Sequence, residues 1–160
     1  MEIDRTKLTY RKLNSGDTDL FVKLRLDFLT ASQKALNETE QGEIAESLKR
    51  YFTKHLEAND FIGMICEYNG NAVSVVYLLI NEKPANASFL NGKAGTILNV
   101  YTYPEYRRNG ISINILKRII DEAKKQDVSV IDLLATQDGE KVYRKLGFTE
   151  TEDKSMRLKL

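Results

Sequence analysis

One short segment combines cationic and small residues in a position suited to binding a phosphate group. It reads Arg107-Arg108-Asn109-Gly110-Ile111-Ser112 and lies between a strand-like run closed by Pro104 and an amphipathic run that starts near Ile111. The first turn of a helix offers unpaired N–H groups and the positive end of the helix dipole. Gly110 leaves that backbone open to a ligand, and two arginines add charge and forked donors. The segment therefore predicts a phosphate or pyrophosphate site at a helix N-terminus.

This segment differs from two other phosphate-binding motifs. The dinucleotide pattern Gly-x-Gly-x-x-Gly and the Gly-Lys-Ser/Thr of a Walker loop are both absent. A solvated arginine pair before a helix-start glycine explains the short motif equally well, and a nucleotide is another phosphate ligand that would suit it. The segment alone does not choose between these interpretations.

A second segment, Lys141-Val142-Tyr143-Arg144-Lys145-Leu146-Gly147-Phe148, carries a phenol that can donate a proton. Leu-Gly-Phe is typical of a helix end, because glycine suits the left-handed position and the next apolar residue folds back on the last turn. Considered by itself, Tyr143 is better explained as a packed aromatic residue. A phenol with a pKa of ~10 is nevertheless protonated at neutral pH and is available as a general acid.

Hydrophobic periodicity predicts the elements that position these segments. Asn69-Gly70-Asn71 joins two apolar runs as a tight hairpin, and residues 111–126 have the period of an amphipathic helix. The fold class is α/β (α+β), with a mixed, mostly antiparallel twisted sheet of six to seven strands and helices on both faces. The crossover through helix 111–126 makes its two flanking strands parallel. Strands are expected at Leu8–Leu13, Phe61–Tyr68, Ala72–Ile80, Gly95–Tyr103, Val128–Leu134 (buried on both faces) and Met156–Leu160. Helices are expected after a cap at Asp17 or Thr18, through Leu48–His55, at 111–126, and in a short stretch ending at Leu146.

The composition limits the classes of partner. The 160 residues are 42% hydrophobic and 29% charged with a net charge of +1, which points to neither nucleic acid nor a membrane surface. No apolar run approaches the ~20 residues of a membrane span, and Met1–Arg5 shows no signal segment. The lone Cys66 cannot form an internal disulfide, so we expect it in the core of a cytoplasmic protein. No metal is expected.

Together the two segments resemble the GNAT superfamily of N-acetyltransferases. Pro104-Glu105-Tyr106 followed by 107–112 is similar to the family's phosphate loop, Arg/Gln-x-x-Gly-x-Gly/Ala after a Pro-Glu-Tyr strand end. Residues 142–148 are similar to the family's later Leu-Tyr-x-Lys-Leu-Gly-Phe. The element order is also similar, so the resemblance covers nearly the whole chain and implies a single acyl-CoA N-acyltransferase domain over residues 1–160.

The resemblance implies a binding mode for acetyl-CoA or coenzyme A. In the family the pantetheine arm lies in a gap where the strand before the loop splays from its parallel neighbour, which implies contacts with Val100, Tyr101 and Thr102. The pyrophosphate would rest on the backbone N–H groups of 107–112, where Ser112 replaces the usual Gly or Ala. Thr136 stands where the family often has an asparagine that touches the cofactor. Tyr143 would protonate the departing thiolate.

The implied reaction is transfer of an acetyl group to a primary amine of a small molecule or peptide by direct attack. A non-catalytic module that senses coenzyme A or docks another protein is the alternative, because Thr96 stands where some family members carry a glutamate base. Glu67 or a chain of water molecules is then left to accept the amine proton. His55 is expected to have a surface or packing role.

The acceptor pocket should be lined by the first two helices and the loop between them. The glutamates there favour either a cationic acceptor, such as a polyamine, an aminoglycoside or a basic side chain, or simply the dipole at a helix start. They are Glu38, Glu40, Glu43 and Glu46. Besides the amine acceptor, a second copy of the chain is an expected partner, as a homodimer.

Overall fold

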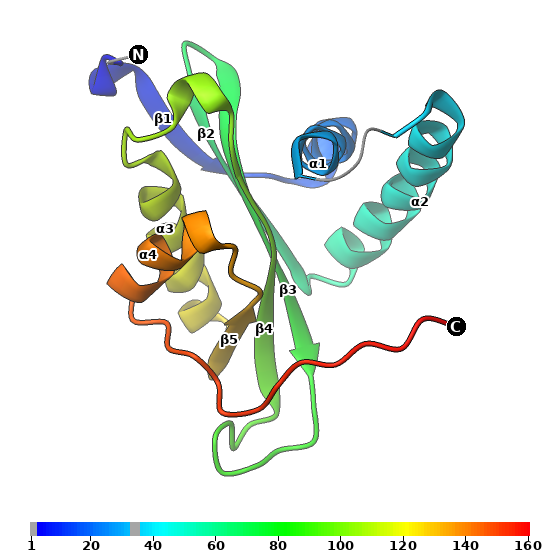
Figure 1. The fold of residues 1–160 in the computed structure, drawn as a ribbon, viewed down its shortest axis with the longest axis vertical. Coiled ribbons are helices and arrows are strands. Elements are labelled where there is room, and N and C mark those ends of the chain that lie inside the picture. Colours follow the sequence, from blue (N-terminus) through cyan, green and yellow to red (C-terminus); the bar gives the residue numbers. More distant parts are fainter. Residues whose placement is uncertain (1–2, 33–35) are drawn as a thin grey trace.

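A twisted five-stranded sheet with the order β1-β2-β3-β4-β5 carries helices on both of its faces (Figure 1). The computed structural model describes residues 3–32 and 36–160. The strands are β1 (Leu8–Lys12), β2 (Phe61–Tyr68), β3 (Asn71–Glu82), β4 (Lys93–Thr102) and β5 (Val130–Leu133). The helices are α1 (Thr18–Ser32), α2 (Glu38–Glu57), α3 (Ile111–Lys125) and α4 (Gln137–Lys145).

The connections follow the predicted order. Strands β1 to β4 pair antiparallel with their neighbours, whereas β4 and β5 pair in parallel across the α3 crossover. The predicted hairpin between β2 and β3 turns at Asn69 and Gly70, whose φ angles are 51° and 78°. These positive values explain why an Asn-Gly pair stands there.

Each face of the sheet has its own apolar cluster. Helix α3 packs Ile115 and Leu116 onto one face, together with the fully buried Cys66. Burial raises the pKa of the Cys66 thiol to about 11. On the other face, Phe21 of α1 and Phe52 of α2 pack against Tyr77 of β3. Figure 1 shows α1 and α2 on one side of the sheet and α3 and α4 on the other.

Two predictions about the strands are wrong. The sheet has five strands among the described residues, not six to seven, because Met156–Leu160 forms no strand. Met156 and Leu158 are 93% and 83% exposed. An alternating sequence forms a strand only where it can pair with a sheet edge and bury its apolar side chains against a surface. Strand β5 is half-buried rather than buried on both faces: Ile131 and Leu133 pack on the α3 cluster, whereas Asp132 points to the opposite, more open face.

In the described part of the chain, none of the helices is both long and apolar enough to cross a membrane. The expected absence of a signal segment at Met1–Arg5 concerns residues 1–2 as well, and these lie outside the described residues.

Gly63 of β2 lies directly against Phe21 on the α1 face of the sheet. A methyl group there would come 2.2 Å from Cε1 of Phe21 and 3.1 Å from Cδ1 of Leu13. We expect Gly63→Ala to lower the free energy of unfolding by about 1–3 kcal/mol, because the ring must leave its place in a packed core.

The matched control is Gly42→Ala on α2, where an added methyl meets no atom within 4 Å. Its free energy of unfolding should stay unchanged or rise by up to about 1 kcal/mol, because alanine is the better helix former. Urea unfolding of the two variants makes the comparison. Equal midpoints would contradict the packing described at Phe21.

Candidate active site

Strand β4 loses its parallel partner halfway along its length. The β4–β5 register runs from Ala94 opposite Val130 to Ile97 opposite Leu133, where β5 ends, whereas β4 continues to Thr102. From Leu98 onward the β5-side edge of β4 is therefore not paired with β5. This opening lies where the family resemblance placed the pantetheine arm.

The backbone direction of β4 decides which polar groups face the opening. The N–H of Tyr103 donates to the Val73 carbonyl on β3 at 3.1 Å. Because successive residues of a strand alternate between its edges, the backbone groups of Val100 and Thr102 point toward the opening, whereas those of Tyr101 point toward β3. Arg107 agrees with this alternation, since its Nε donates to the Thr102 carbonyl at 3.0 Å. Val100 is thus left with an N–H and a carbonyl at the opening.

The segment after β4 turns into α3 with an open backbone at Gly110. Gly110 precedes α3 with a φ of 76°, and no side chain caps the first turn of the helix, so its leading N–H groups are free for a ligand. A Cβ at Gly110 would meet no atom within 4 Å, which leaves the backbone open. Arg108 also has a positive φ, 64°. Asn109 Nδ2 holds the turn by donating to the carbonyls of Tyr106 and Arg107, each at 3.1 Å.

The side chains of this segment have different surroundings. Ile111 is buried at 2% exposure in the α3 cluster, and Ser112 beside it is half-buried. On β4, Val100 packs against the α3 cluster and Tyr101 against the α1 cluster, whereas the Thr102 hydroxyl lies 2.7 Å from Ser74 Oγ. The β4 side chains are engaged with the two faces, so it is the backbone that meets the opening.

Tyr143 lies on α4, on the α3 side of the sheet. Its ring is 9% exposed and packs on the α3 cluster, with the Phe148 ring centroid 6.0 Å away. Burial raises the pKa of the Tyr143 hydroxyl, which therefore keeps its proton throughout the neutral range. A Cβ at Gly139 would come 2.8 Å from the ring, so glycine lets the ring lie against its own helix. Thr136 caps α4 by accepting from the Gly139 N–H at 3.3 Å and keeps its own hydroxyl proton to donate.

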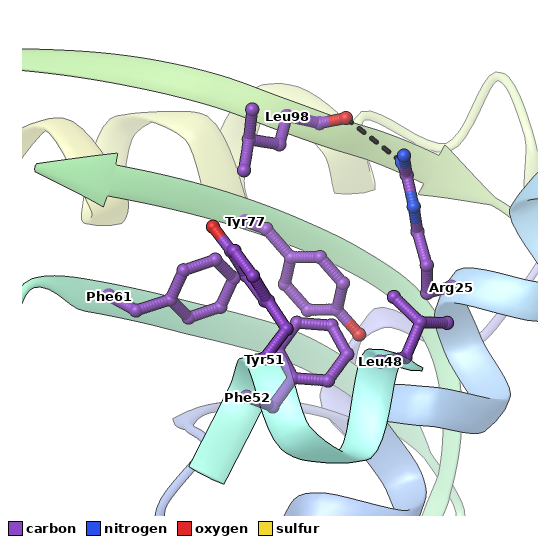
Figure 2. A pocket seen from close by; sticks show the side chains of 7 residues that line it. All are labelled: Arg25, Leu48, Tyr51, Phe52, Phe61, Tyr77 and Leu98. Atoms are coloured by element: carbon purple, nitrogen blue, oxygen red, sulfur yellow. Dashed lines mark hydrogen bonds between the residues drawn. The ribbon is translucent and has the colours of Figure 1, made fainter. Parts of the chain in front are cut away.

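A cavity of about 250 Å³ opens on the other face of the sheet, between α1, α2 and β4 (Figure 2). It reaches β4 at Leu98, a bulge residue that has no partner on β3, because Tyr77 pairs with Asn99 and the next residue of β3 pairs with Ile97. Leu98 is also the first residue beyond the last β5 pair. The cavity and the opening in the sheet therefore meet at this bulge. Its lining is mostly aromatic: Arg25, Leu48, Tyr51, Phe52, Phe61, Tyr77 and Leu98.

Arg25 brings a cation to this cavity from α1. Its Nη1 donates to the Leu98 carbonyl at 3.2 Å and to Asn99 Oδ1 at 2.9 Å, and its guanidinium lies 5.2 Å from the Phe28 ring centroid. Burial lowers the pKa of Arg25, and no carboxylate of the described residues pairs with it. Asn99 is 1% exposed, and its Nδ2 has no hydrogen-bond partner. Beside the bulge, Asn99 Nδ2 is thus without a hydrogen-bond partner among the described residues, and Arg25 has neutral acceptors but no carboxylate.

The sequence analysis missed Arg25, the bulge and the cavity. A signal for Arg25 was present, because it follows Phe21 by four residues and so continues that residue's buried helical stripe. Asn99 was the one polar residue in the run Ile97–Tyr101. The bulge had no signal of its own, because it depends on how β4 aligns with β3.

Glu67, the carboxylate predicted as a candidate base, lies away from β4. Glu67 lies on β2, with β3 between it and β4, and its Oε1 accepts from Arg11 Nε at 3.0 Å. Asp132 was not considered, yet the β4–β5 register sets it directly beside Thr96. Its carboxylate lies 3.5 Å from Lys83 Nζ and is 48% exposed. Asp132 and Thr96 share the sheet face on which the cavity opens.

The acidic residues at the start of α2 stabilise the N-terminus of that helix. Asn37 and Glu40 form a reciprocal capping box, with hydrogen bonds of 2.9 and 3.0 Å between their side chains and backbones. None of the four glutamates lines the cavity, which favours the dipole interpretation over a cationic acceptor. His55 has the expected packing role: it bonds Asp60 at 2.8 Å and its ring lies 4.3 Å from that of Tyr51. The described residues contain no group of three His, Cys, Asp or Glu suited to a metal ion.

Comparison with known families agrees with this geometry. The model of the acetyltransferase (GNAT) domain matches residues 9–151, which include β4, the loop and Tyr143. The chain belongs to the GNAT acetyltransferase family. It is an acyl-CoA-dependent N-acetyltransferase domain.

Individual relatives match this GNAT domain over different extents. A predicted acetyltransferase from Clostridium acetobutylicum, whose crystal structure contains acetyl-CoA, is 31% identical, with a TM-score of 0.85 over 95% of this chain and 96% of the other. The uncharacterized N-acetyltransferase ycf52 of Porphyra purpurea is 32% identical over 140 residues, 83% of this chain and 77% of that protein. Its counterpart from Pyropia yezoensis matches at 28% identity over 88 residues, about half of each chain (50% and 51%).

Proposed function

We propose that this GNAT domain transfers the acetyl group of acetyl-CoA to a primary amine of a small molecule or peptide by direct attack. The observation that carries the proposal is the opening along β4 beyond Ile97. On the α3 side the opening leads to the anion-binding loop and Tyr143, and on the α1 side it meets the cavity at Leu98. Donor and acceptor would thus approach the same strand from opposite faces.

The donor side uses backbone groups. The N–H and carbonyl of Val100, flanked by Tyr101 and Thr102, would pair with the amides of the pantetheine arm in place of the missing β5. The free N–H groups at the start of α3, from Gly110 through Ser112, would hold the pyrophosphate, with charge from Arg107 and Arg108. The hydroxyl of Thr136 would donate to the cofactor where the loop meets α4.

The reaction then needs two proton movements. The neutral amine nitrogen forms a bond to the thioester carbon, and the carbonyl oxygen takes the charge, stabilised by the N–H of Val100. Collapse breaks the carbon–sulfur bond. Tyr143 gives its proton to the sulfur, while the nitrogen loses one proton, so the products are an amide and free coenzyme A. The raised pKa of Tyr143 keeps the donor form present at neutral pH.

Asp132 is our proposed acceptor for the proton that leaves the nitrogen. Its position beside Thr96 puts a carboxylate on the cavity face of the sheet, close to where the site meets the bulge. Its 48% exposure allows the proton to pass on to solvent. This assignment replaces Glu67, which its ion pair with Arg11 holds on β2.

We also propose that one GNAT-like domain spans residues 1–160. The family match over residues 9–151 and the sheet shared by both halves of the chain support this extent. A cytoplasmic location stays a prediction from the lone cysteine, and a homodimer stays a prediction as well.

Gly110→Glu should abolish binding of coenzyme A, because it places a bulky anion where the pyrophosphate would lie. The matched control is Gly70→Glu, since Gly70 has a φ of 78° against 76° for Gly110 and a Cβ at either position meets no atom within 4 Å. Both variants therefore carry similar backbone strain. Calorimetric titration with coenzyme A should show loss of binding in the first variant only. Unchanged affinity in Gly110→Glu would contradict the phosphate site.

Tyr143→Phe should lower kcat by about 100- to 10,000-fold while the Kd for acetyl-CoA changes little, since only the proton donor is removed. Tyr68→Phe removes a hydroxyl from a half-buried tyrosine on β2 and should leave kcat unchanged. Steady-state release of coenzyme A measures both. A Tyr143→Phe variant with full kcat would exclude the tyrosine as the acid.

Asp132→Asn should lower kcat by about 100-fold or more at neutral pH, because the carboxylate that accepts the amine proton is lost. Glu67→Gln should affect stability through its ion pair with Arg11 and leave kcat within about twofold, a difference that corresponds to under 0.5 kcal/mol. If the two variants show equal kcat values, Asp132 is not the base.

A further inference from the structure

We propose that the acceptor is an apolar α-amino acid, a small amine with a carboxylate on the carbon that bears the nitrogen and with an apolar side chain. This inference rests on the proposed function and specifies its substrate class. It assigns Arg25 to the substrate carboxylate and the aromatic cavity to the substrate side chain.

Arg25 is the first observation. A half-buried guanidinium is costly unless an anion or several acceptors compensate its charge. Here the carbonyl of Leu98 and the amide oxygen of Asn99 occupy Nη1, no carboxylate of the described chain pairs with the group, and its pKa is lowered by burial. Nη1 thus has two neutral acceptors and the guanidinium lies over the Phe28 ring, but no carboxylate of the described residues neutralises its charge. A carboxylate from a ligand would supply the missing charge through the planar fork of donors.

Asn99 is an independent second observation. Its Nδ2 is fully buried without a partner, and a donor left in that state costs about 1–3 kcal/mol. The same amide group accepts from Arg25 through Oδ1 at 2.9 Å, so the free donor and the guanidinium belong to one cluster. Exchanging the amide oxygen and nitrogen would face Arg25 with another donor, so the hydrogen bond to Arg25 supports this orientation. A ligand carboxylate bound by Arg25 would join this cluster through the guanidinium, which lines the cavity.

The lining of the cavity indicates which kind of side chain the acceptor carries. Its wall is formed by the rings of Tyr51, Phe52, Phe61 and Tyr77, with Leu48 and Leu98 at its sides, as Figure 2 shows. The Tyr77 hydroxyl is already bound to the Phe21 carbonyl at 2.8 Å and offers no proton to a ligand. No acidic side chain lines the wall. A volume of about 250 Å³ is enough for one apolar side chain.

The contact of Arg25 with the bulge would bring a bound carboxylate close to the reacting amine. Arg25 donates to the carbonyl of Leu98, the bulge residue at the opening where the thioester would lie. A carboxylate held by Arg25 therefore brings its α-amino group to the bulge, with Asp132 beyond it on the same face. The cation of Arg25 would thus face the substrate carboxylate, and the carboxylate of Asp132 would face the substrate ammonium group.

The test compares leucine with leucinamide as acceptors of the wild-type protein. The two differ in the carboxylate alone, and the amide has the more reactive amine at neutral pH, because a neighbouring carboxylate raises the pKa of an ammonium group. A preference for leucine must therefore come from the protein. We expect kcat/KM for leucine to exceed that for leucinamide by about ten- to a hundredfold, the size of a charged hydrogen bond.

Two variants locate the preference. Arg25→Gln should bring the leucine-to-leucinamide ratio of kcat/KM close to one, whereas Arg50→Gln, an exposed arginine on α2, should leave the ratio unchanged. Leu48→Phe adds bulk to the cavity wall while the Arg25 side chain is retained, and it should shift the preference from leucine to alanine while keeping the preference for acid over amide. This second variant tests the cavity even if Arg25→Gln fails to fold.

Three results would overturn the inference. Leucinamide equal to or better than leucine with the wild-type protein would do so, as would an unchanged ratio in a folded Arg25→Gln variant. In both cases acetylation of some amine leaves the proposed function standing. Absence of acetylation with leucine, leucinamide, a polyamine and a lysine peptide alike, despite bound acetyl-CoA, would overturn the proposed function together with the inference.

Discussion

Strand β4 is hydrogen-bonded along its length on one edge and along only four register positions on the other, from Ala94 to Ile97. Backbone groups that lose their ladder partner must find another, and a linear ligand with its own amides meets that need. The bulge at Leu98 falls at the same point, where it twists the strand and re-aims its carbonyl toward Arg25. The position of the site is therefore set by the register of β4 with its two neighbours, and the surrounding side chains add specific contacts to the exposed backbone groups.

The two faces of β4 carry different groups. Toward α3 the strand leads into a loop whose two positive φ angles, at Arg108 and Gly110, turn successive N–H groups outward beside a helix with no capping side chain. Toward α1 it meets an aromatic wall and a cation that lacks a carboxylate. The first face suits phosphates of many kinds, and the second is selective.

The sequence alone predicts a donor site, whereas no local pattern in it indicates the acceptor cavity. Gly110 and the arginines before it are contiguous, and Tyr143 lies in a local helix-end pattern, so each is visible in a window of a few residues. Arg25, Tyr51, Tyr77 and Leu98 come from four elements, and only tertiary packing unites them. The same limit explains the errors about strands: Met156–Leu160 has a strand's alternation, and no local pattern reports whether a sheet edge receives it. Asp132 became visible only through its register with Thr96.

Cys66 is buried beneath α3, and its thiol should therefore react very slowly with thiol reagents. A thiol with no exposed surface and a pKa of about 11 is almost entirely protonated at neutral pH, and the thiolate is the reactive form. It is also the only cysteine in the sequence. The folded protein therefore has no reactive cysteine that could compete with the amine for the thioester, although the reaction releases a free thiol. It is equally shielded from forming a mixed disulfide with the coenzyme A that it releases.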